Sequence, residues 1–489
     1  MRWPPRWWRI ARWWPYTATL TRLSPSCASI PSKRNGAPMA ETTGFVQRLK
    51  WDTASAVLVA YIGGDPTSTE AFTILKQAAD SDATISAKRG MVRLLQHALL
   101  HGFQVVVTHP ANGAELSQVQ VPVIDLTQNP VQLDAIEVTQ AIQDLSQSIP
   151  LVVGKGTVVR VYLSNYSNAS MTVSGELSLS RGSSDAPVAV ASANTVLLDP
   201  AQAGNLAAAR GDAARSLNFV MPPTHTAEGP LRVTIASIID VSTGNTVSIG
   251  RERQPVLRFI ASPPLRVRIL GIRYQQGTPP VAFVPSSLDF DLLVSWLGRA
   301  YPVGQVISSR TVIDATALPP FGCGDINAQL AAIRALDMSA GGDPTTHYYG
   351  LVSDGGFFMR GCAAGIPATA DPSTVASGPT GPATWGWDFD GSYGDWYGGH
   401  ELGHTFGRKH PGFCGETQDD LQNYPFANGQ LADSADSFVG FDVGDLVQGL
   451  PMTALPGQSW HDVMTYCNFE WLSPYTYRGI LDRLIAEGS

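Results

Sequence analysis

The sequence predicts a multidomain protein in which a small α/β or barrel-like module and an all-β sandwich precede a C-terminal α+β domain. Three observations support this prediction. The chain of 489 residues is long enough for about three domains, each with its own core. Short apolar runs with period-two alternation fill residues 133–262, whereas residues 264–489 alternate between strand-like and helix-like segments.

Residues 1–42 are predicted to be a disordered or mis-annotated leader. Residues 1–40 hold seven basic residues, no acidic residue and five of the twelve tryptophans. The segment lacks the apolar core of a secretory signal, and Met39 begins MAETTGF, which reads as an ordinary protein start. The whole chain has a net charge of −8 despite this basic segment, so its body is acidic, which argues against nucleic-acid binding.

Residues 43–123 are predicted to form the small α/β or barrel-like module. An apolar run at 54–63 reads as a strand, residues 86–102 show helical periodicity, and 103–109 and 116–121 alternate like strands. A linker is expected at 124–130. No catalytic pattern occurs in this region, so its role stays open.

Residues 133–262 are predicted to form an antiparallel β-sandwich of immunoglobulin-like type. Six alternating runs are separated by Gly, Asn, Asp or Ser, as in such sandwiches. The segment contains no catalytic constellation. A structural module is the default interpretation, and an adhesive or glycan-binding role is the alternative.

The C-terminal domain is predicted over 264–489 from a succession of strands and helices. We expect strands at 264–274, 305–315 and 347–353, helices at 286–301 and 325–340, an edge strand at 361–368, and a further helix opening near Trp396.

That last helix carries the most informative motif in the chain. His400, Glu401, His404, Gly407 and His410 form HExxHxxGxxH. Two histidines four residues apart on a helix share one face, and a glycine with positive φ can end the helix and return the third histidine to the same ion. Three imidazoles leave one position of Zn²⁺ open, which is typical of a catalytic zinc site. Glu401 is then the predicted general base.

A chance match is the alternative to a zinc site. Histidine is scarce, with 9 in 489 residues. Composition gives a probability of about 10⁻⁵ for all five fixed positions. A degenerate, inactive descendant of an enzyme is therefore a better alternative than coincidence.

With this motif the chain resembles the metzincin metallopeptidases, whose long zinc motif is followed by a turn that carries methionine. The segment HDVMTYC supplies Met464 as the Met-turn residue, and Tyr466 follows in the M-x-Y arrangement of the astacin and serralysin branches. Pro411 is also similar to serralysins, but the calcium-binding repeats that follow a serralysin catalytic domain are missing. The resemblance implies a zinc endopeptidase acting on protein or glycoprotein substrates, in which Met464 forms a floor under the metal and Tyr466 approaches it. The alternative is an adhesive or glycan-binding protein whose peptidase domain is subsidiary or inactive.

The cysteines suggest an oxidising compartment. Four of the five, Cys323, Cys362, Cys414 and Cys467, lie in the predicted C-terminal domain, and an even number in one domain favours two disulfides, with free buried thiols as the alternative. Together with the metzincin resemblance, the cysteines imply a secreted protein. Four cysteines permit three pairings. The metzincin resemblance brings the segment after the third histidine and the Met-turn beneath one metal, which implies Cys414 with Cys467 and leaves Cys323 with Cys362.

Two further predictions concern other ligands and the membrane. Several aspartates could hold Ca²⁺, although their spacing matches no known loop and solvated turns are the alternative: Asp388, Asp390, Asp395, Asp442 and Asp445. No apolar run reaches the roughly 18 residues of a membrane span, so no transmembrane segment is predicted. The sequence carries no signal for the oligomeric state.

Overall fold

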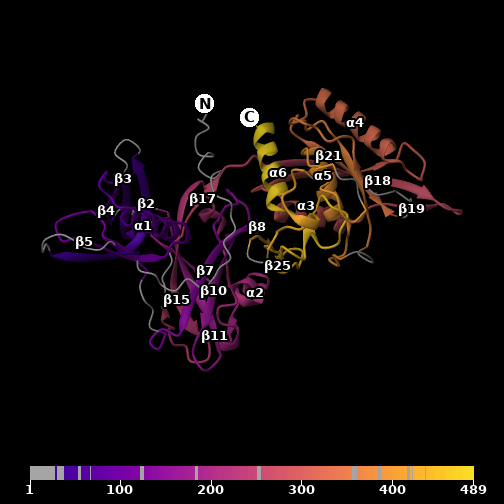
Figure 1. Ribbon diagram of the computed structural model, residues 1–489. Helices are drawn as coiled ribbons and strands as arrows, with labels where there is room; N and C mark the ends of the chain where they lie inside the picture. Colours follow the sequence, from indigo (N-terminus) through magenta and orange to yellow (C-terminus); the bar gives the residue numbers. More distant parts are fainter. Residues whose placement is uncertain are drawn as a thin grey trace. The chain divides into compact units, whose positions relative to one another are not determined.

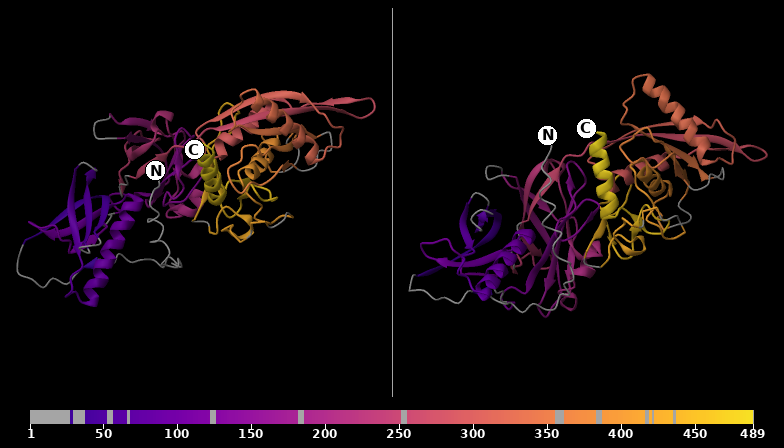
Figure 2. Two further views of the ribbon diagram at one scale, coloured as in Figure 1. Left: turned by 90° about the horizontal axis from the view of Figure 1, so that it is seen from above. Right: turned by 45° about the horizontal axis from the view of Figure 1, so that its top comes forward.

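The computed structural model describes residues 38–488 and the backbone of 28–29, apart from residues 53–56, 66–67, 122–125, 182–185, 251–254, 355–360, 383–386, 416–418, 421 and 435–436. The described chain divides into two compact units, one formed by residues up to 99 and 105–121, the other by 100–104 and residues from 126 onward. Within these residues the protein is mostly β-structure, with six α-helices and several sheets (Figures 1 and 2).

The first unit is one sheet with one helix. Its strands are β1 (Ala28–Ser29), β2 (Met39–Asp52), β3 (Val57–Asp65), β4 (Ser68–Leu75), β5 (Gln104–Pro110) and β6 (Gln118–Gln120), in the order β1-β6-β5-β2-β3-β4, with helix α1 (Asp82–His101) between β4 and β5. Helix α1 buries Met91, Leu95 and Ala98, which lie three and four residues apart on one face. Thr73 of β4 exchanges backbone hydrogen bonds with residues 114 and 116 before β6, which curls the sheet towards a barrel.

The predicted boundary between leader and module at residue 42 is wrong. Strand β2 begins at Met39, so residues 39–42 belong to the sheet, and β1 pairs with β6. The first residues of β2, upstream of Thr43, include small and polar side chains. They lack the run of apolar residues from which a strand is predicted. The basic, tryptophan-rich part of the leader, with Cys27, lies outside the described residues.

The second unit begins with a two-sheet sandwich. One sheet has the order β14-β10-β7-β16 and the other β12-β11-β15-β17-β9, with β13 added to β11. The strands are β7 (Val131–Thr139), β9 (Leu151–Val152), β10 (Val158–Asn165), β11 (Met171–Ser180), β12 (Val188–Ala191), β13 (Val196–Leu198), β14 (Leu217–Val220), β15 (Gly229–Asp240), β16 (Ile249–Gly250) and β17 (Val256–Ile260). Both sheets contribute to one apolar core, which includes Val159, Leu217, Leu177 and Phe259.

Two sheets thus share a core over this segment, but their strands are not all antiparallel, and the immunoglobulin-like type stays a prediction. Strands β16 and β7 pair in parallel, as do β17 and β9. The short strands β9 and β16 reach these positions through long connections, which alternation within each run does not reveal. A short helix, α2 (Leu206–Arg210), also interrupts the strand pattern.

The C-terminal domain contains a mainly parallel sheet. Strands β20 (Val306–Asp314), β18 (Leu265–Gln276), β21 (His347–Ser353) and β23 (Ala376–Thr380) are parallel in this spatial order, while β22 (Cys362–Ala363) is antiparallel at the edge next to β23. Strand β19 (Val281–Phe283) forms a hairpin with β18, which the sequence analysis missed. The predicted strands, helices and edge strand of 264–368 are otherwise confirmed.

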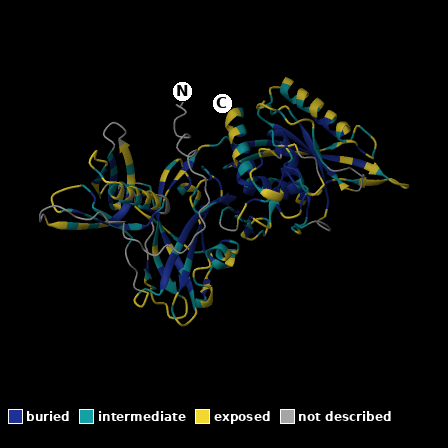
Figure 3. Ribbon diagram, in the orientation of Figure 1, coloured by how far each residue is buried: buried dark blue, intermediate teal, exposed yellow. Residues whose placement is uncertain are grey.

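Helices cover both faces of this sheet. Strand β18 alternates strictly: Val267 and Ile269 face a core shared with helices α3 (Ser287–Ala300) and α5 (Gly394–Thr405), whereas Leu270 and Ile272 face a core shared with α4 (Cys323–Ser339). In Figure 3 the central strands are buried and the outer side of α4 is exposed. The motif-bearing helix α5 therefore packs beside α3 against one buried face of the sheet.

A strand from the sandwich segment joins a sheet and the core of the C-terminal domain in this unit. Strand β8 (Ile142–Gln143) pairs with β24 (Val439–Asp442), which also pairs with β25 (Thr453–Pro456). The indole of Trp471 donates a hydrogen bond of 2.8 Å to the carbonyl of Ala141. Ala141, Ile142 and Ile149 consequently belong to the C-terminal core, although residues 133–262 were predicted as a separate domain. The chain closes with β26 (His461–Asp462), β27 (Glu470–Trp471) and helix α6 (Pro474–Glu487).

Candidate metal centre

Helix α5 ends where the sequence analysis expects it to end. Gly407 has φ of +74°, a conformation that glycine adopts without strain. The amide of Gly407 donates to the carbonyl of His404 at 2.8 Å, and the amide of Arg408 donates to the carbonyl of Gly403 at 3.0 Å. These bonds close the helix and turn the chain back, so that His410 returns towards the helix.

The three motif histidines converge. The Nε2 atom of His410 lies 3.1 Å from Nε2 of His400 and 3.0 Å from Nε2 of His404. His400 and His404 are buried and His410 is partly buried. Nitrogen atoms so close together fit one small ion, and among the described residues this is one of two groups able to hold a metal.

Backbone carbonyls fix which nitrogen faces the centre. Nδ1 of His400 lies 2.6 Å from the carbonyl oxygen of Val463, and Nδ1 of His404 lies 2.8 Å from that of Arg408. A carbonyl only accepts, so each Nδ1 must carry the proton, which leaves each Nε2 lone pair for a metal. Nδ1 of His410 faces the carboxylate of Asp419 at 3.9 Å.

The histidines are held in the neutral form that binds metals. Burial lowers the pKa of His404 to about 4, with His410 as a further cause. Burial also lowers the pKa of His400 well below its ordinary value and that of His410 below its ordinary value. A set of neutral, tautomerically fixed imidazoles fits a Zn²⁺ ion.

Glu401 lies beside this group with an oxygen that lacks a partner. Its side chain is buried, and Oε2 accepts no hydrogen bond from the described part of the chain. Burial raises the pKa of Glu401 well above its usual range, while the backbone amide of Ala363 on β22 lowers it. Gly361 lies so close that a β-carbon there would be 2.7 Å from Oε1. A buried carboxyl with a free oxygen is suited to exchange a proton with a non-protein group.

Met464 packs directly beneath the helix between its two histidines. It is 1% exposed, and a β-carbon on Gly403 would lie 2.5 Å from its sulfur. The fully buried Asp462 accepts a hydrogen bond of 2.8 Å from the amide of Met464 and one of 3.1 Å from the amide of Ser473, which fixes the turn. The methionine is placed under the histidines, as the resemblance implies, and no ligand role follows from this position.

Tyr466 lies beside the same histidines. Its ring centroid is 5.7 Å from that of His400 and 5.3 Å from that of His410. The structure thus brings together all six residues selected from the sequence: His400, Glu401, His404, His410, Met464 and Tyr466.

The loop that carries His410 is anchored from two sides. The amide of Asp420 donates to the carbonyl of His410 at 2.8 Å, and the hydroxyl of Tyr475 on α6 donates to Asp420 at 2.7 Å. The disulfide Cys414–Cys467 joins this loop to the Met-turn segment, with Cα atoms 5.1 Å apart. The predicted pairing of these two cysteines is confirmed.

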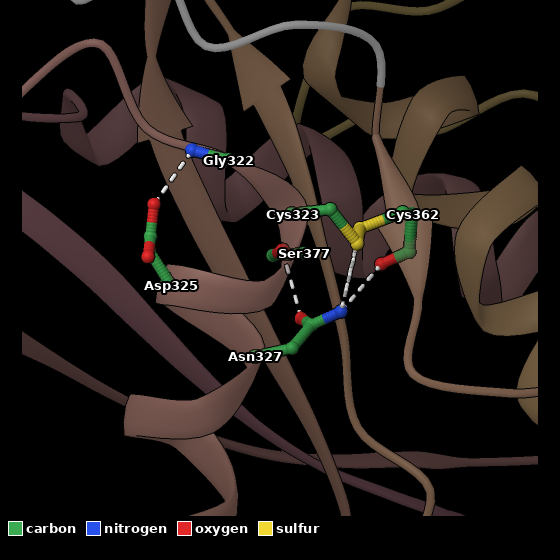
Figure 4. Close-up of a disulfide and its surroundings, with 6 residues drawn as sticks. All are labelled: Gly322, Cys323, Asp325, Asn327, Cys362 and Ser377. Atoms are coloured by element: carbon green, nitrogen blue, oxygen red, sulfur yellow. Dashed lines mark hydrogen bonds between the residues drawn. A yellow bond between two sulfur atoms is a disulfide. The ribbon is translucent and has the colours of Figure 1, made fainter.

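The second predicted disulfide, Cys323–Cys362, is also confirmed, and it anchors the edge strand. It joins the start of α4 to β22 (Figure 4). The side-chain amide of Asn327 on α4 donates from Nδ2 to the backbone carbonyl of Cys362 at 3.1 Å. Its Oδ1 accepts from the hydroxyl of Ser377 on β23 at 2.9 Å. Edge strand β22, whose Ala363 amide faces Glu401, is therefore held in place by a covalent bond and a hydrogen-bonded bridge.

A hollow of about 150 Å³, here called the site hollow, opens beside the histidines. Its walls come from helix α5 and the segment after Met464, and they comprise Trp396, Tyr397, His400, Glu401, Thr465, Tyr466, Cys467, Asn468 and Glu470. Both walls carry aromatic rings as well as polar groups, which suits a side chain or small group next to the metal centre.

Sequence reasoning missed the residues that position the ligands. The carbonyls of Val463 and Arg408 and the amide of Ala363 are backbone groups, for which side-chain identity carries no signal. The side chain of Asp420 acts through a long-range contact with α6, which local sequence does not reveal. Asp462 could have been found, because an aspartate two residues before the turn methionine is typical of a residue that binds a turn amide.

Within the described residues, no helix combines the length and apolar character needed to cross a membrane.

Comparisons with known proteins identify no family for this chain. No family model matches the sequence, and no curated protein matches it. Among solved structures, the chain is similar to a polysaccharide deacetylase from Bacillus cereus, with 10% sequence identity and a TM-score of 0.15. The alignment covers 45% of this chain and 60% of that chain, so it spans less than two thirds of the deacetylase. A likeness of this size carries no inference about fold or activity.

Proposed function

We propose that the chain is a zinc-dependent endopeptidase resembling the metzincins, with His400, His404 and His410 as metal ligands and Glu401 as general base. The observation that carries this proposal is the convergence of three Nε2 atoms next to a buried carboxylate with a free oxygen. Nε2 of His410 lies 3.1 Å from that of His400 and 3.0 Å from that of His404. A structural zinc site would instead close with a fourth protein ligand.

The proposed chemistry divides between the metal and the chain. A Zn²⁺ ion held by three imidazoles acts as a Lewis acid towards a carbonyl group and makes water a better nucleophile at neutral pH. Glu401 would accept a proton from the attacking water and deliver it to the leaving amine. Its raised pKa suits this exchange, because a carboxyl that holds its proton more tightly is a stronger base.

Protein or glycoprotein substrates fit the surroundings of this centre. Strand β22 pairs with β23 on one side, and no described strand pairs with its other side. An extended peptide can add to such an edge through backbone hydrogen bonds that do not depend on its side chains. The site hollow would then receive one substrate side chain, while the cut bond lies near Glu401.

The two disulfides are compatible with an extracellular location, which we propose for this enzyme. Cytosolic thiols are mostly kept reduced, whereas disulfides persist after secretion.

Metal binding provides the direct test. The purified chain is expected to hold one Zn²⁺ by elemental analysis and to lose hydrolysis of a denatured protein when 1,10-phenanthroline is added. Replacing His410 by Ala should leave a two-histidine site that loses zinc during dialysis against a mild chelator. Replacing His225 of the sandwich is the matched control and should keep both zinc and activity. A His410→Ala variant that retains zinc as firmly as the parent would contradict the ligand assignment.

Tyr466 is proposed to donate a hydrogen bond to the oxyanion that forms during hydrolysis. The change Tyr466→Phe keeps the ring beside His400 and His410 and removes only the hydroxyl. A donor role predicts a fall in kcat of about 10²-fold with KM nearly unchanged. Steady-state kinetics at equal zinc content would check this. Unchanged turnover would show that Tyr466 only packs against the histidines.

A further inference from the structure

A second cluster of ligand-type side chains lies at the start of helix α5, in its first turn and in the segment that precedes it. One carboxylate oxygen each from Asp388, Asp390 and Asp395 lies within 4.8 Å of the others. These residues share the segment DFDGSYGD, which runs directly into the helix that carries His400. Asp388 and Asp390 are partly buried, and Asp395 is 0% exposed. The cluster contains no histidine or cysteine, so it is distinct in chemistry from the zinc ligands.

The orientation of two of these carboxylates is fixed by backbone amides. Oδ1 of Asp390 accepts from the amide of Ser392 at 3.1 Å, and Oδ1 of Asp395 accepts from the amide of Trp396 at 2.7 Å. The second oxygen of each, Oδ2, is buried and accepts no hydrogen bond from an N–H or hydroxyl donor among the described residues. Burial raises the pKa of Asp390, whereas its carboxyl lies close enough to that of Asp395 to share a proton, which lowers this pKa. A fully buried carboxylate oxygen without a donor is costly, so this arrangement favours a positively charged group between the two aspartates.

The neighbouring basic side chains do not supply that group. The Arg299 guanidinium is bonded to Asp442 and to the hydroxyl of Ser295. Lys155 donates to the backbone carbonyls of Gly298 and Arg299 at 2.7 and 2.8 Å. Burial raises the pKa values of all three aspartates of the cluster and the charge of Arg299 lowers them, but this guanidinium is already paired with Asp442. One paired cation thus faces four carboxylates.

The directions of the pKa shifts in the cluster agree with this charge imbalance. Burial, and next the charge of Asp390, raise the pKa of Asp388 to about 6. Burial followed by the charges of Asp390 and Asp388 raises the pKa of Asp395 well above its ordinary value. Without a cation, the three carboxyls cannot all be ionised near neutral pH.

Space for water lies next to the cluster. A cavity of about 200 Å³ is lined in part by Asp388, Asp390 and Asp442 and by the rings of Trp387 and Trp460. Calcium takes six to eight oxygen ligands in irregular arrangements, so carboxylates can be completed by water from this cavity. Magnesium demands a nearly ideal octahedron, and zinc prefers nitrogen and sulfur ligands.

We propose that Asp388, Asp390 and Asp395 bind one Ca²⁺ ion that fixes the segment leading into the zinc helix. The ion supplies the charge that the two free Oδ2 atoms lack. Ser392, between the ligands, donates to Asp289 on α3 at 2.6 Å, as does Thr380 on β23. The ion would therefore fix a segment that these hydrogen bonds already join to α3 and to the sheet. Trp396, which follows Asp395 directly, lines the site hollow, so occupancy of the ion site stiffens a wall of the metal centre.

Terbium luminescence provides the test, because Tb³⁺ occupies calcium sites and is sensitised by nearby tryptophans. The experiment uses the zinc-loaded full chain with Glu401→Gln, which removes self-cleavage. We expect one Tb³⁺ site that Ca²⁺ displaces and that Mg²⁺ displaces only weakly. Asp395→Asn should lower Ca²⁺ affinity about 10-fold or more, because the change removes one of three anionic ligands while keeping the shape. Asp371→Asn, which alters an aspartate that caps the turn at Ser373, is the matched control and should bind like the parent.

A second variant keeps the test decisive. If Asp395→Asn does not fold, as judged by circular dichroism, the partly buried Asp388→Asn replaces it. Calcium should also raise the Tm of the parent but not that of either ligand variant. The proposal is overturned if the parent shows no Ca²⁺-displaceable Tb³⁺, or if the folded ligand variants bind Ca²⁺ like the parent. Because the readout is binding in a hydrolysis-deficient background, this outcome leaves the peptidase proposal untouched, and loss of the peptidase proposal leaves this one standing.

Discussion

Replacing Glu401 by Gln is expected to leave one zinc ion bound and to lower the rate of protein hydrolysis by about 10²–10⁴-fold. The amide keeps the size of the side chain and fits the same space beside Gly361 and Ala363. It cannot accept the proton that the attacking water must lose. The three histidines are untouched, and the carbonyls that fix the tautomers of His400 and His404 stay in place, so zinc should remain bound.

The measurement separates chemistry from metal loss. Zinc content by elemental analysis and kcat/KM on a denatured protein substrate are determined for the parent, for Glu401→Gln and for Glu176→Gln. Glu176 is exposed on β11 of the sandwich, so the same chemical change there should alter neither quantity. A Glu401→Gln variant that hydrolyses protein as fast as the parent would refute the proposed role of this carboxylate.

The convergence of the three histidines was predictable because the motif is local in sequence. The helical step from His400 to His404 and the positive φ at Gly407 follow from backbone geometry alone, and the structure brings His410 to the same point. The position of Met464 required a resemblance to known enzymes, because no local rule joins it to a helix more than fifty residues earlier. Its observed packing against Gly403 is a long-range contact.

What escaped prediction depends on groups without a side-chain signature. The carbonyls of Val463 and Arg408 orient the histidines, and any residue type supplies a carbonyl. Strand β8 was assigned to the sandwich by its position in the sequence, but it completes the sheet of β24 and β25 in the C-terminal domain. Period-two alternation identifies strands and their buried faces, whereas it does not identify their partners.

Removing each disulfide in turn should have similar effects on the free energy of unfolding but different effects on zinc binding. They span 53 residues between Cys414 and Cys467, and 39 between Cys323 and Cys362. Loop-closure entropy grows only with the logarithm of length, so replacing either pair by Ser should cost about 4 kcal/mol of unfolding free energy. Denaturant unfolding of the zinc-free proteins would measure both losses, and they should be similar.

Zinc affinity should instead fall only in the double variant that lacks the Cys414–Cys467 disulfide. Phe413 and Cys414 have φ of +85° and +57°, a left-handed region that costs non-glycine residues about 1–3 kcal/mol each. The bridge from Cys414 to Cys467 holds this strained segment beside the Met-turn. Once the bridge is removed, the segment can relax and carry the loop of His410 away from the other two ligands.

The Cys323–Cys362 pair lies at the edge strand instead, where Asn327 also holds β22. Its loss should raise KM through a looser substrate edge and leave zinc retention near that of the parent. Chelator competition would compare zinc retention in the two double variants while both are folded. Each would be measured at the same difference in denaturant concentration below its own unfolding midpoint. If Cys414→Ser/Cys467→Ser kept zinc as firmly as Cys323→Ser/Cys362→Ser, the hydrogen bonds of Asp420 with His410 and Tyr475 would be sufficient to place the third ligand, and the bridge would serve stability alone.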